Sequence, residues 1–302
     1  MVETRSSKLK SQVRNETVIP VKSSHKRVVD ETTLTSTKRV RTGDTVTNKE
    51  MSFRDKFNLE NNESALADIH SYLLSKASKK TSTFLTKYFR VEEYKTGDII
   101  LGIKVPEIRF LSKSLDFLPF PILRGLIKSK YHEERLLAII NVVEKYKTSQ
   151  DSTIQESIFN FFVEEMISGV DNWDLVDTSA GKIVGAYLRD KPNLKRFWLF
   201  EKFVKSNRLW DRRIAIVATQ HFIKYGEYDD TLELAEILLR DEEDLIHKAT
   251  GWTLREMGKK SNETLIKFLD QHAQDMPRVM LRYSIEKLSV QERKKYMKLD
   301  KK

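Results

Sequence analysis

The sequence has 302 residues, among them 10 glycines, 6 prolines and no cysteine. An average protein uses about 7% Gly and 5% Pro, and folds built of many short strands need both residues at their turns. Their scarcity here favours a mostly helical chain. The absence of cysteine excludes a disulfide framework, a thiol nucleophile and any metal site built on thiolates, and we expect an intracellular protein.

The charge balance indicates an acidic partner. Lys and Arg number 54 against 44 Asp and Glu, which gives a net charge of +10. Nucleic acid is the first candidate and an anionic membrane the second, while a lysine-rich surface without a partner explains the same numbers. The longest apolar run, at residues 136–143, is far shorter than the roughly 18 residues needed to cross a bilayer. We therefore expect no membrane-spanning segment.

Residues 1–50 differ in composition from the rest of the chain. They contain no aromatic residue among Phe, Tyr and Trp, and they hold half of the net charge. Such a segment buries too little apolar area to offset the entropy of ordering it, so we predict a disordered basic tail followed by one folded domain over residues 51–302. The tail carries two basic clusters, Lys26-Arg27 and Lys38-Arg39-Val40-Arg41. They are typical of a bipartite nuclear import signal, which predicts a nuclear protein if the source is eukaryotic and a cytoplasmic one otherwise.

A degenerate repeat follows residue 118. Apolar periodicity predicts five helix pairs, with first helices near residues 120–130, 154–167, 194–204, 231–239 and 264–273. The second helices are predicted to open near His132, Trp173, Trp210, His247 and Arg278. Their spacing lies just below the roughly 40 to 47 residues of HEAT-type solenoids. Because such a pair buries its apolar face only against its neighbours, we expect a stacked array.

Aromatic and charged residues recur where these second helices open. Trp173 and Asp177 are four residues apart, and Trp210 and Arg213 are three apart, so each pair shares a helix face. A tryptophan in a helical protein is most often a packing residue, and packing explains each one alone. Their recurrence at matching phase, each with a polar companion one turn on, instead favours a shared binding surface, on which arginine suits phosphate.

Several ordered motifs in one register resemble the DNA alkylation repair enzymes of the AlkD type, over roughly residues 60–298. The segments that resemble this family are the stretch from Gly102 to Pro106, His132-Glu133-Glu134-Arg135, Asn172-Trp173-Asp174-Leu175-Val176-Asp177, Leu209-Trp210-Asp211-Arg212-Arg213-Ile214-Ala215, Asp244-Leu245-Ile246-His247-Lys248-Ala249, Gly251-Trp252-Thr253-Leu254-Arg255-Glu256 and Met276-Pro277-Arg278-Val279-Met280-Leu281-Arg282-Tyr283.

The resemblance implies an all-α superhelical solenoid of HEAT-like helix pairs with a concave DNA-binding face. It further implies a DNA glycosylase that releases N3- or N7-alkylated purines in base excision repair, acting on a base that stays stacked. Carried over by position, Asp177 is the catalytic carboxylate, Trp173 and Trp252 are aromatic walls, and Arg213 contacts DNA beside the lesion. We expect further DNA contacts from the aromatic and charged residues at the other helix openings, namely His132, Arg135, Trp210, Arg212, His247, Lys248, Arg278 and Arg282.

Release of an alkylated purine needs only one carboxylate. Alkylation at N3 or N7 makes the purine cationic and a good leaving group, so the general acid of the usual two-carboxylate arrangement is not needed. The remaining carboxylate stabilises the oxocarbenium-like sugar and positions water, and tryptophan faces attract the charged base. The expected partner is double-stranded DNA containing alkylated bases, bound by a monomer without cofactor or metal.

Two other functions stay open at this point. A non-catalytic solenoid that recognises distorted or branched DNA needs the basic face but not the Trp173–Asp177 pair. A protein-interaction scaffold of HEAT type needs neither, and its charge is incidental. Base release separates the first hypothesis from these two, and binding to DNA separates the second from the third.

Overall fold

The computed structural model describes residues 53–89 and 97–299, and in this part of the chain the backbone forms helices and no β-strand. The all-α prediction is confirmed. Contacts divide the chain into two units, Met1–Lys49 and Glu50–Lys302, and everything below concerns the second. The predicted tail and its basic clusters lie outside the described residues. Within the described residues, no helix is long and apolar enough to span a bilayer.

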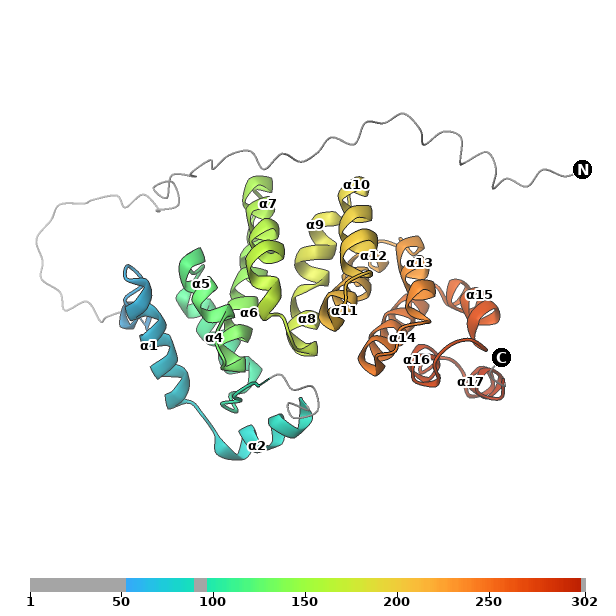
Figure 1. The fold of residues 1–302 in the computed structure, drawn as a ribbon, viewed down its shortest axis with the longest axis horizontal. Helices are drawn as coiled ribbons and strands as arrows, with labels where there is room; N and C mark the ends of the chain where they lie inside the picture. The colour runs from blue at the N-terminus through green and yellow to red at the C-terminus, as the bar shows by residue number, and fades with distance from the viewer. Residues whose placement is uncertain (1–52, 90–96, 300–302) are drawn as a thin grey trace, which may run out of the picture. The chain divides into compact units, whose positions relative to one another are not determined.

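The helices follow one another along the chain (Figure 1). In chain order they are η2 (Phe53–Lys56), α1 (Asn62–Ser75), α2 (Lys79–Tyr88), α4 (Val105–Leu115), α5 (Phe120–Ile127), α6 (His132–Thr148), α7 (Ser152–Phe161), η3 (Phe162–Met166), η4 (Ile167–Gly169), α8 (Trp173–Ser179), η5 (Gly181–Gly185), α9 (Ala186–Leu188), α10 (Pro192–Lys195), η6 (Arg196–Phe203), α11 (Leu209–Ala218), α12 (Gln220–Ile223), α13 (Asp229–Leu238), α14 (Asp244–Gly258), α15 (Asn262–His272), α16 (Arg278–Ser284) and α17 (Val290–Met297).

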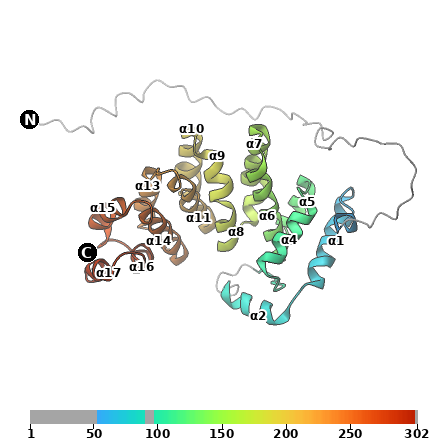
Figure 2. The ribbon, with the colours of Figure 1, turned by 180° about the vertical axis from the view of Figure 1, so that it is seen from behind.

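The second helix of each predicted pair packs against the second helix of the next, and α4, which precedes the first predicted pair, packs against α6. The order is α4 on α6, α6 on α8, α8 on α11, α11 on α14 and α14 on α16. Figures 1 and 2 show these helices succeeding one another along the unit. We call this series the inner row. The superhelical course and the concave face stay predictions.

The predicted openings of the second helices are close to the observed ones. Helices α6, α8 and α16 begin at His132, Trp173 and Arg278, as predicted, whereas α11 begins one residue and α14 three residues earlier than expected. Backbone amides at helix starts are satisfied by side chains where the sequence offers them, as when Asn172 accepts from the N–H of Trp173 at 2.7 Å. This cap fixes the start of α8, on which the candidate site depends.

Stacking makes the helices of the inner row mostly buried. In α6 even the polar residues of the first turn are buried, because neighbours lie on both sides of the helix. Among them is Glu133, whose carboxylate accepts hydrogen bonds from the N–H groups of Leu101, Gly102 and Ile103 at 2.7 to 3.2 Å. Gly102 has φ +83°, and a Cβ there would lie 2.4 Å from the carbonyl oxygen of Ser78. The loop before α4 is thus held by one buried carboxylate.

A π-helical turn continues α8 after the candidate site. This turn is η5, and Gly185 at its end lies so close to the next pair that a Cβ there would come within 2.1 Å of the carbonyl oxygen of Ala218. Such π-turns often occur at functional sites. The glycine permits the close approach of α8 and η5 to α11 and α12. This approach brings the candidate site residues of successive helices within reach of one another.

Candidate active site

Asp177 and Arg213 form the centre of the candidate site. The Nε–H and Nη2–H groups of Arg213 donate to the two carboxylate oxygens of Asp177 at 3.0 and 2.9 Å. Its Nη1 donates to the carbonyl oxygen of Leu245 at 2.8 Å. Arg213 is buried, while the Asp177 side chain is 19% exposed. The prediction that Arg213 contacts DNA is therefore wrong for the side chain as it lies here, because its donors are used by Asp177 and Leu245. One guanidinium therefore joins α8, α11 and α14 and leaves the carboxylate at the surface of the inner row.

The charge state of Asp177 reflects two opposing influences. Burial raises the pKa of the Asp177 carboxyl, and the nearby charge of Asp174 acts in the same direction. The charge and hydrogen bonds of Arg213 oppose this shift, but the pKa stays above its usual value. Each carboxylate oxygen keeps a lone pair beyond its bond to Arg213, which is available to a water molecule or to a positive charge on a sugar.

Trp173 lies one turn before Asp177, at the start of α8. Its ring centroid is 5.5 Å from those of Tyr88 and Phe89, and the side chain is half-buried. Tyr88 itself is exposed. The end of α2 thus supports one side of the tryptophan and adds a second exposed ring beside it. No sequence pattern indicated Tyr88, because α2 precedes the repeat and is not one of its helix openings.

Trp252 lies on α14, seven residues after Leu245, which accepts from Arg213. Residues seven apart lie on the same face of a helix, so Trp252 shares a helix face with Leu245. Its Nε1–H donates to Oε1 of Glu256 at 3.2 Å, and the side chain is half-buried. The indole is therefore fixed by its edge, and part of it stays accessible.

His132 and Arg135 are not surface residues, and the prediction that they contact DNA is wrong for the side chains as they lie here. His132 is 1% and Arg135 is 3% exposed. His132 bonds through Nε2 to Asp174 at 2.8 Å and through Nδ1 to Asp98 at 3.3 Å, and Arg135 pairs with Asp98 at 2.6 Å. They form an internal ion cluster that connects the loop before α4, α6 and α8.

This cluster changes the ionisation of its histidine. Burial lowers the pKa of His132, but the charges and hydrogen bonds of Asp174 and Asp98 outweigh it and raise the pKa to about 9. Asp174, in the first turn of α8, is thereby bonded to His132. The first turn of α8, which carries Trp173, is tied to α6 by a charged contact.

Trp210 is also buried, so the prediction that it contacts DNA is wrong for the side chain as it lies here. It is 8% exposed and belongs to the main hydrophobic core. Of the three tryptophans at helix openings, this one has the packing role that a single tryptophan most often has. Its neighbour Arg212 pairs with Asp241 at 2.6 Å and donates to the carbonyl oxygen of Ser206 at 3.0 Å, so its charge is largely satisfied within the protein.

The remaining predicted DNA contacts lie nearer the surface. His247 bonds to the carbonyl oxygen of Asp241 at 2.6 Å, and Lys248 pairs with Asp244 at 2.5 Å. Arg278 donates to the carbonyl oxygen of Met297 at 2.6 Å, whereas Arg282 is exposed. Their contacts with DNA stay predictions. Lys248 would have to exchange its carboxylate partner for phosphate.

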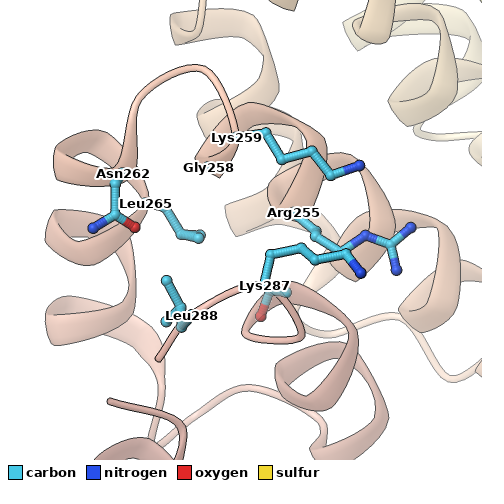
Figure 3. A pocket seen from close by; sticks show the side chains of 8 residues that line it. Arg255, Gly258, Lys259, Asn262, Leu265, Lys287 and Leu288 are labelled. Atoms are coloured by element: carbon cyan, nitrogen blue, oxygen red, sulfur yellow. The ribbon is translucent and has the colours of Figure 1, made fainter. Parts of the chain in front are cut away.

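A pocket of about 330 Å³ lies apart from these residues, among α14, α15 and α16. Figure 3 shows the side chains of Arg255, Lys259 and Lys287 along one of its walls. Arg255 is paired with Glu286, and Lys259 with Glu256 at 2.7 Å. The lining includes neither Trp173 nor Asp177. The candidate site is therefore a surface of the inner row and not part of this pocket.

The unit is all-helical and its helices stack on one another. Successive helices carry a carboxylate, a guanidinium and two half-buried tryptophans. These features are those of a helical-repeat protein. The family model of the DNA alkylation repair enzymes matches residues 69–288. The chain belongs to the DNA alkylation repair enzyme family. It is similar in structure to a predicted DNA alkylation repair enzyme from Enterococcus faecalis, with a TM-score of 0.55 and 19% sequence identity, over 71% of this chain and 98% of that one. No curated protein sequence matches the chain.

Proposed function

We propose that this member of the DNA alkylation repair family is a DNA glycosylase that excises N3- or N7-alkylated purines in base excision repair. The observation that supports this best is the Asp177 carboxylate, held at two points by Arg213 and still partly exposed. A fixed carboxylate one helical turn after Trp173, joined through Arg213 to the helix that carries Trp252, suits a reaction in which positive charge develops on a sugar. Membership of the family supports a role in the repair of alkylated DNA.

In the proposed reaction, water attacks C1′ of the damaged nucleotide, the N-glycosidic bond breaks, and the attacking water loses one proton to the solvent to leave a hydroxyl on C1′. The bonding electrons go to the purine, which leaves as a neutral base because its ring was cationic. Asp177 stabilises the oxocarbenium-like sugar and accepts a hydrogen bond from the attacking water. Arg213 keeps the carboxylate oriented, so that no reorganisation is needed as charge develops.

The tryptophans supply selectivity for a charged base. The face of an indole attracts a cation by about 0.5 to 2 kcal/mol, and an unmodified purine lacks this charge. Trp173 and Trp252 are both half-buried and each is fixed by neighbours, Trp173 by rings of α2 and Trp252 by Glu256. We infer that both stand against the damaged nucleotide, with the base left in its stack.

The expected partner is double-stranded DNA that contains alkylated bases, bound by a monomer. The nuclear destination, if the source is eukaryotic, stays a proposal that rests on the basic clusters of residues 1–50.

The test is release of 7-methylguanine and 3-methyladenine from methylated duplex DNA by the full chain, with Asp177→Asn as the matched variant. We expect release by the wild type and a loss on the order of 3 kcal/mol in the variant, as for removal of one electrostatic stabiliser, with DNA binding kept. Equal release by both proteins would overturn the role of Asp177. Binding to DNA without release by the wild type would favour the non-catalytic alternative.

A further inference from the structure

Four cations lie on successive layers of the stack, on the inner-row helices α4 and α6 and on η5 and α12, which follow the inner-row helices α8 and α11. None of them belongs to the candidate site. Arg109 is on α4, Lys147 is in the last turn of α6, Lys182 is in η5 and Lys224 is the residue that ends α12. The elements that carry them pack on one another in this order, α4 on α6, α6 on η5 and η5 on α12. We call these residues the cation row.

Lys182 is the central member and the one nearest to the candidate site. It follows Asp177 by five residues, and its charge lowers the pKa of the Asp177 carboxyl. Lys182 is half-buried, and the other three are exposed. Burial lowers the pKa of Lys182, and the charges of Arg109, Lys147 and Lys224 lower it further, against a smaller opposing influence of Glu144. Each of the other three cations therefore acts on Lys182.

The row is only partly neutralised within the protein. Arg109 and Lys147 share one carboxylate, that of Glu144, at 3.9 and 3.2 Å. In the described part of the chain, Lys182 and Lys224 form no ion pair with a carboxylate. In lacking an acidic partner within this part of the chain, Lys182 and Lys224 differ from most of the cations that the sequence predicts to contact DNA. Arg212 and Lys248, for example, each hold an acidic partner.

Like charges gathered in this way repel one another and reduce the stability of the folded protein. A polyanion removes this repulsion, and the binding of phosphates also releases the counterions condensed on DNA. Helices that pack together are separated by roughly 8 to 10 Å. Four successive layers thus span roughly 24 to 30 Å, the axial length of roughly seven to nine base pairs at 3.4 Å each.

We propose that Arg109, Lys147, Lys182 and Lys224 bind successive phosphates of the DNA backbone and hold the duplex against Asp177. This inference rests on the proposed function, because the DNA is its substrate. Lys182 binds the phosphate nearest to the reacting sugar, and the other three cations extend the bound surface along α4, α6 and α12. They position the substrate and take no part in bond cleavage.

The test measures the affinity of the full chain for an unmodified duplex over a range of salt concentrations. The variants are Lys182→Gln and the double variant Lys182→Gln with Lys224→Gln. The matched control is Lys205→Gln, which removes the same charge from an exposed lysine that pairs with Glu201 and follows η6, a first helix of its pair. The slope of log K against log salt concentration becomes less steep by about 0.9 for each phosphate that the protein no longer neutralises. For a tenfold change in salt concentration, the affinity of the variant then changes about eightfold less than that of the wild type.

We expect a slope smaller by about 0.9 for Lys182→Gln and by nearly twice that for the double variant, with no change for Lys205→Gln. Denaturation by urea checks the fold, and we expect the variants to be at least as stable as the wild type because repulsion is relieved. A slope in the double variant equal to that of the control overturns the cation row, even if the wild type releases methylated bases. A reduced slope in a protein that releases no base supports the row and overturns the glycosylase proposal instead.

Discussion

The guanidinium of Arg213 holds both carboxylate oxygens of Asp177, at 3.0 and 2.9 Å, across two adjacent helices of the stack. The same group bonds to the backbone of a third helix at Leu245. The pair has a structural and a chemical consequence. It fixes the relative position of three successive layers, and it presents a carboxylate that is oriented before any substrate binds.

The structural consequence is testable with a double-mutant cycle. Arg213→Ala leaves the mostly buried Asp177 charge without its partner, and breaking a buried ion pair in this way costs about 3 to 5 kcal/mol. Asp177→Asn with Arg213→Ala removes both charges. We expect the free energy of unfolding, measured in urea, to fall less in this double variant than the sum of the two single changes. Additive losses would show that the pair does not act as a unit.

The chemical consequence concerns the pH dependence of base release. Burial raises the pKa of Asp177 above its usual value, in spite of Arg213. Because the proposed reaction needs the ionised carboxylate, activity is lost as the pH falls through this raised pKa. We expect the acid limb of the rate profile to lie above the ordinary aspartate value of about 3.9. The measurement is single-turnover release of 7-methylguanine, corrected for spontaneous loss from DNA alone. A limb at or below 3.9 would contradict the assignment.

Trp252 provides a test of charge recognition. In Trp252→Leu the indole face is lost while the apolar volume is mostly kept, and the attraction to the cationic base, about 0.5 to 2 kcal/mol, disappears. We expect base release to slow by roughly two- to thirtyfold, the same energy expressed as a rate, and Trp252→Phe to lose less. The control is Trp198→Leu, since Trp198 is a half-buried tryptophan that packs against Phe159 and Phe203. Equal effects of Trp252→Leu and Trp198→Leu on release would indicate that packing alone explains Trp252.

The order of the helices was predictable from the sequence, since apolar spacing and the repeated openings fix where each helix starts. The ion pair of Asp177 with Arg213 was not predicted, because the two residues lie 36 positions apart and the sequence indicates only the helices that carry them. The burial of Trp210 was not predictable. A tryptophan near a helix start faces the core or the surface depending on the rotation of the helix about its axis, and the sequence leaves this rotation open. The neighbours of His132 lie 34 and 42 residues away, so no local pattern indicated that its charge is used inside the protein.

The cation row was missed for a related reason. The recurring aromatic and charged residues mark the openings of the second helices, whereas Lys147 and Lys224 lie at the far ends of α6 and α12. Lysines are frequent in this chain, and nothing in their spacing distinguishes these from solvated ones. Only the packing of η5 between α6 and α12 brings them near Lys182.

His132 links stability to pH. Its folded pKa of about 9 lies above the value of about 6.5 expected in the unfolded chain. The protonated ring therefore stabilises the fold fully below pH 6.5, and this stabilisation is lost as the pH rises through 9. A shift of this size corresponds to a stabilisation on the order of 3 kcal/mol. The source is the pair of carboxylates on either side of the ring, Asp98 and Asp174.

Urea denaturation of the wild type at pH 6, 7.5 and 9 measures this stabilisation, and we expect the free energy of unfolding to decrease over this range. In His132→Gln the decrease attributable to the ring disappears, and the variant is less stable than the wild type mainly at pH 6, where the wild type has its cation. The control is His272→Gln, which removes a histidine on α15 that lies 3.4 Å from Glu236 and is more accessible. If His132→Gln keeps the full pH dependence of the wild type, the ion cluster does not hold its proton. The contact between His132 on α6 and Asp174 at the start of α8 would then be a hydrogen bond to a neutral ring and not an ion pair.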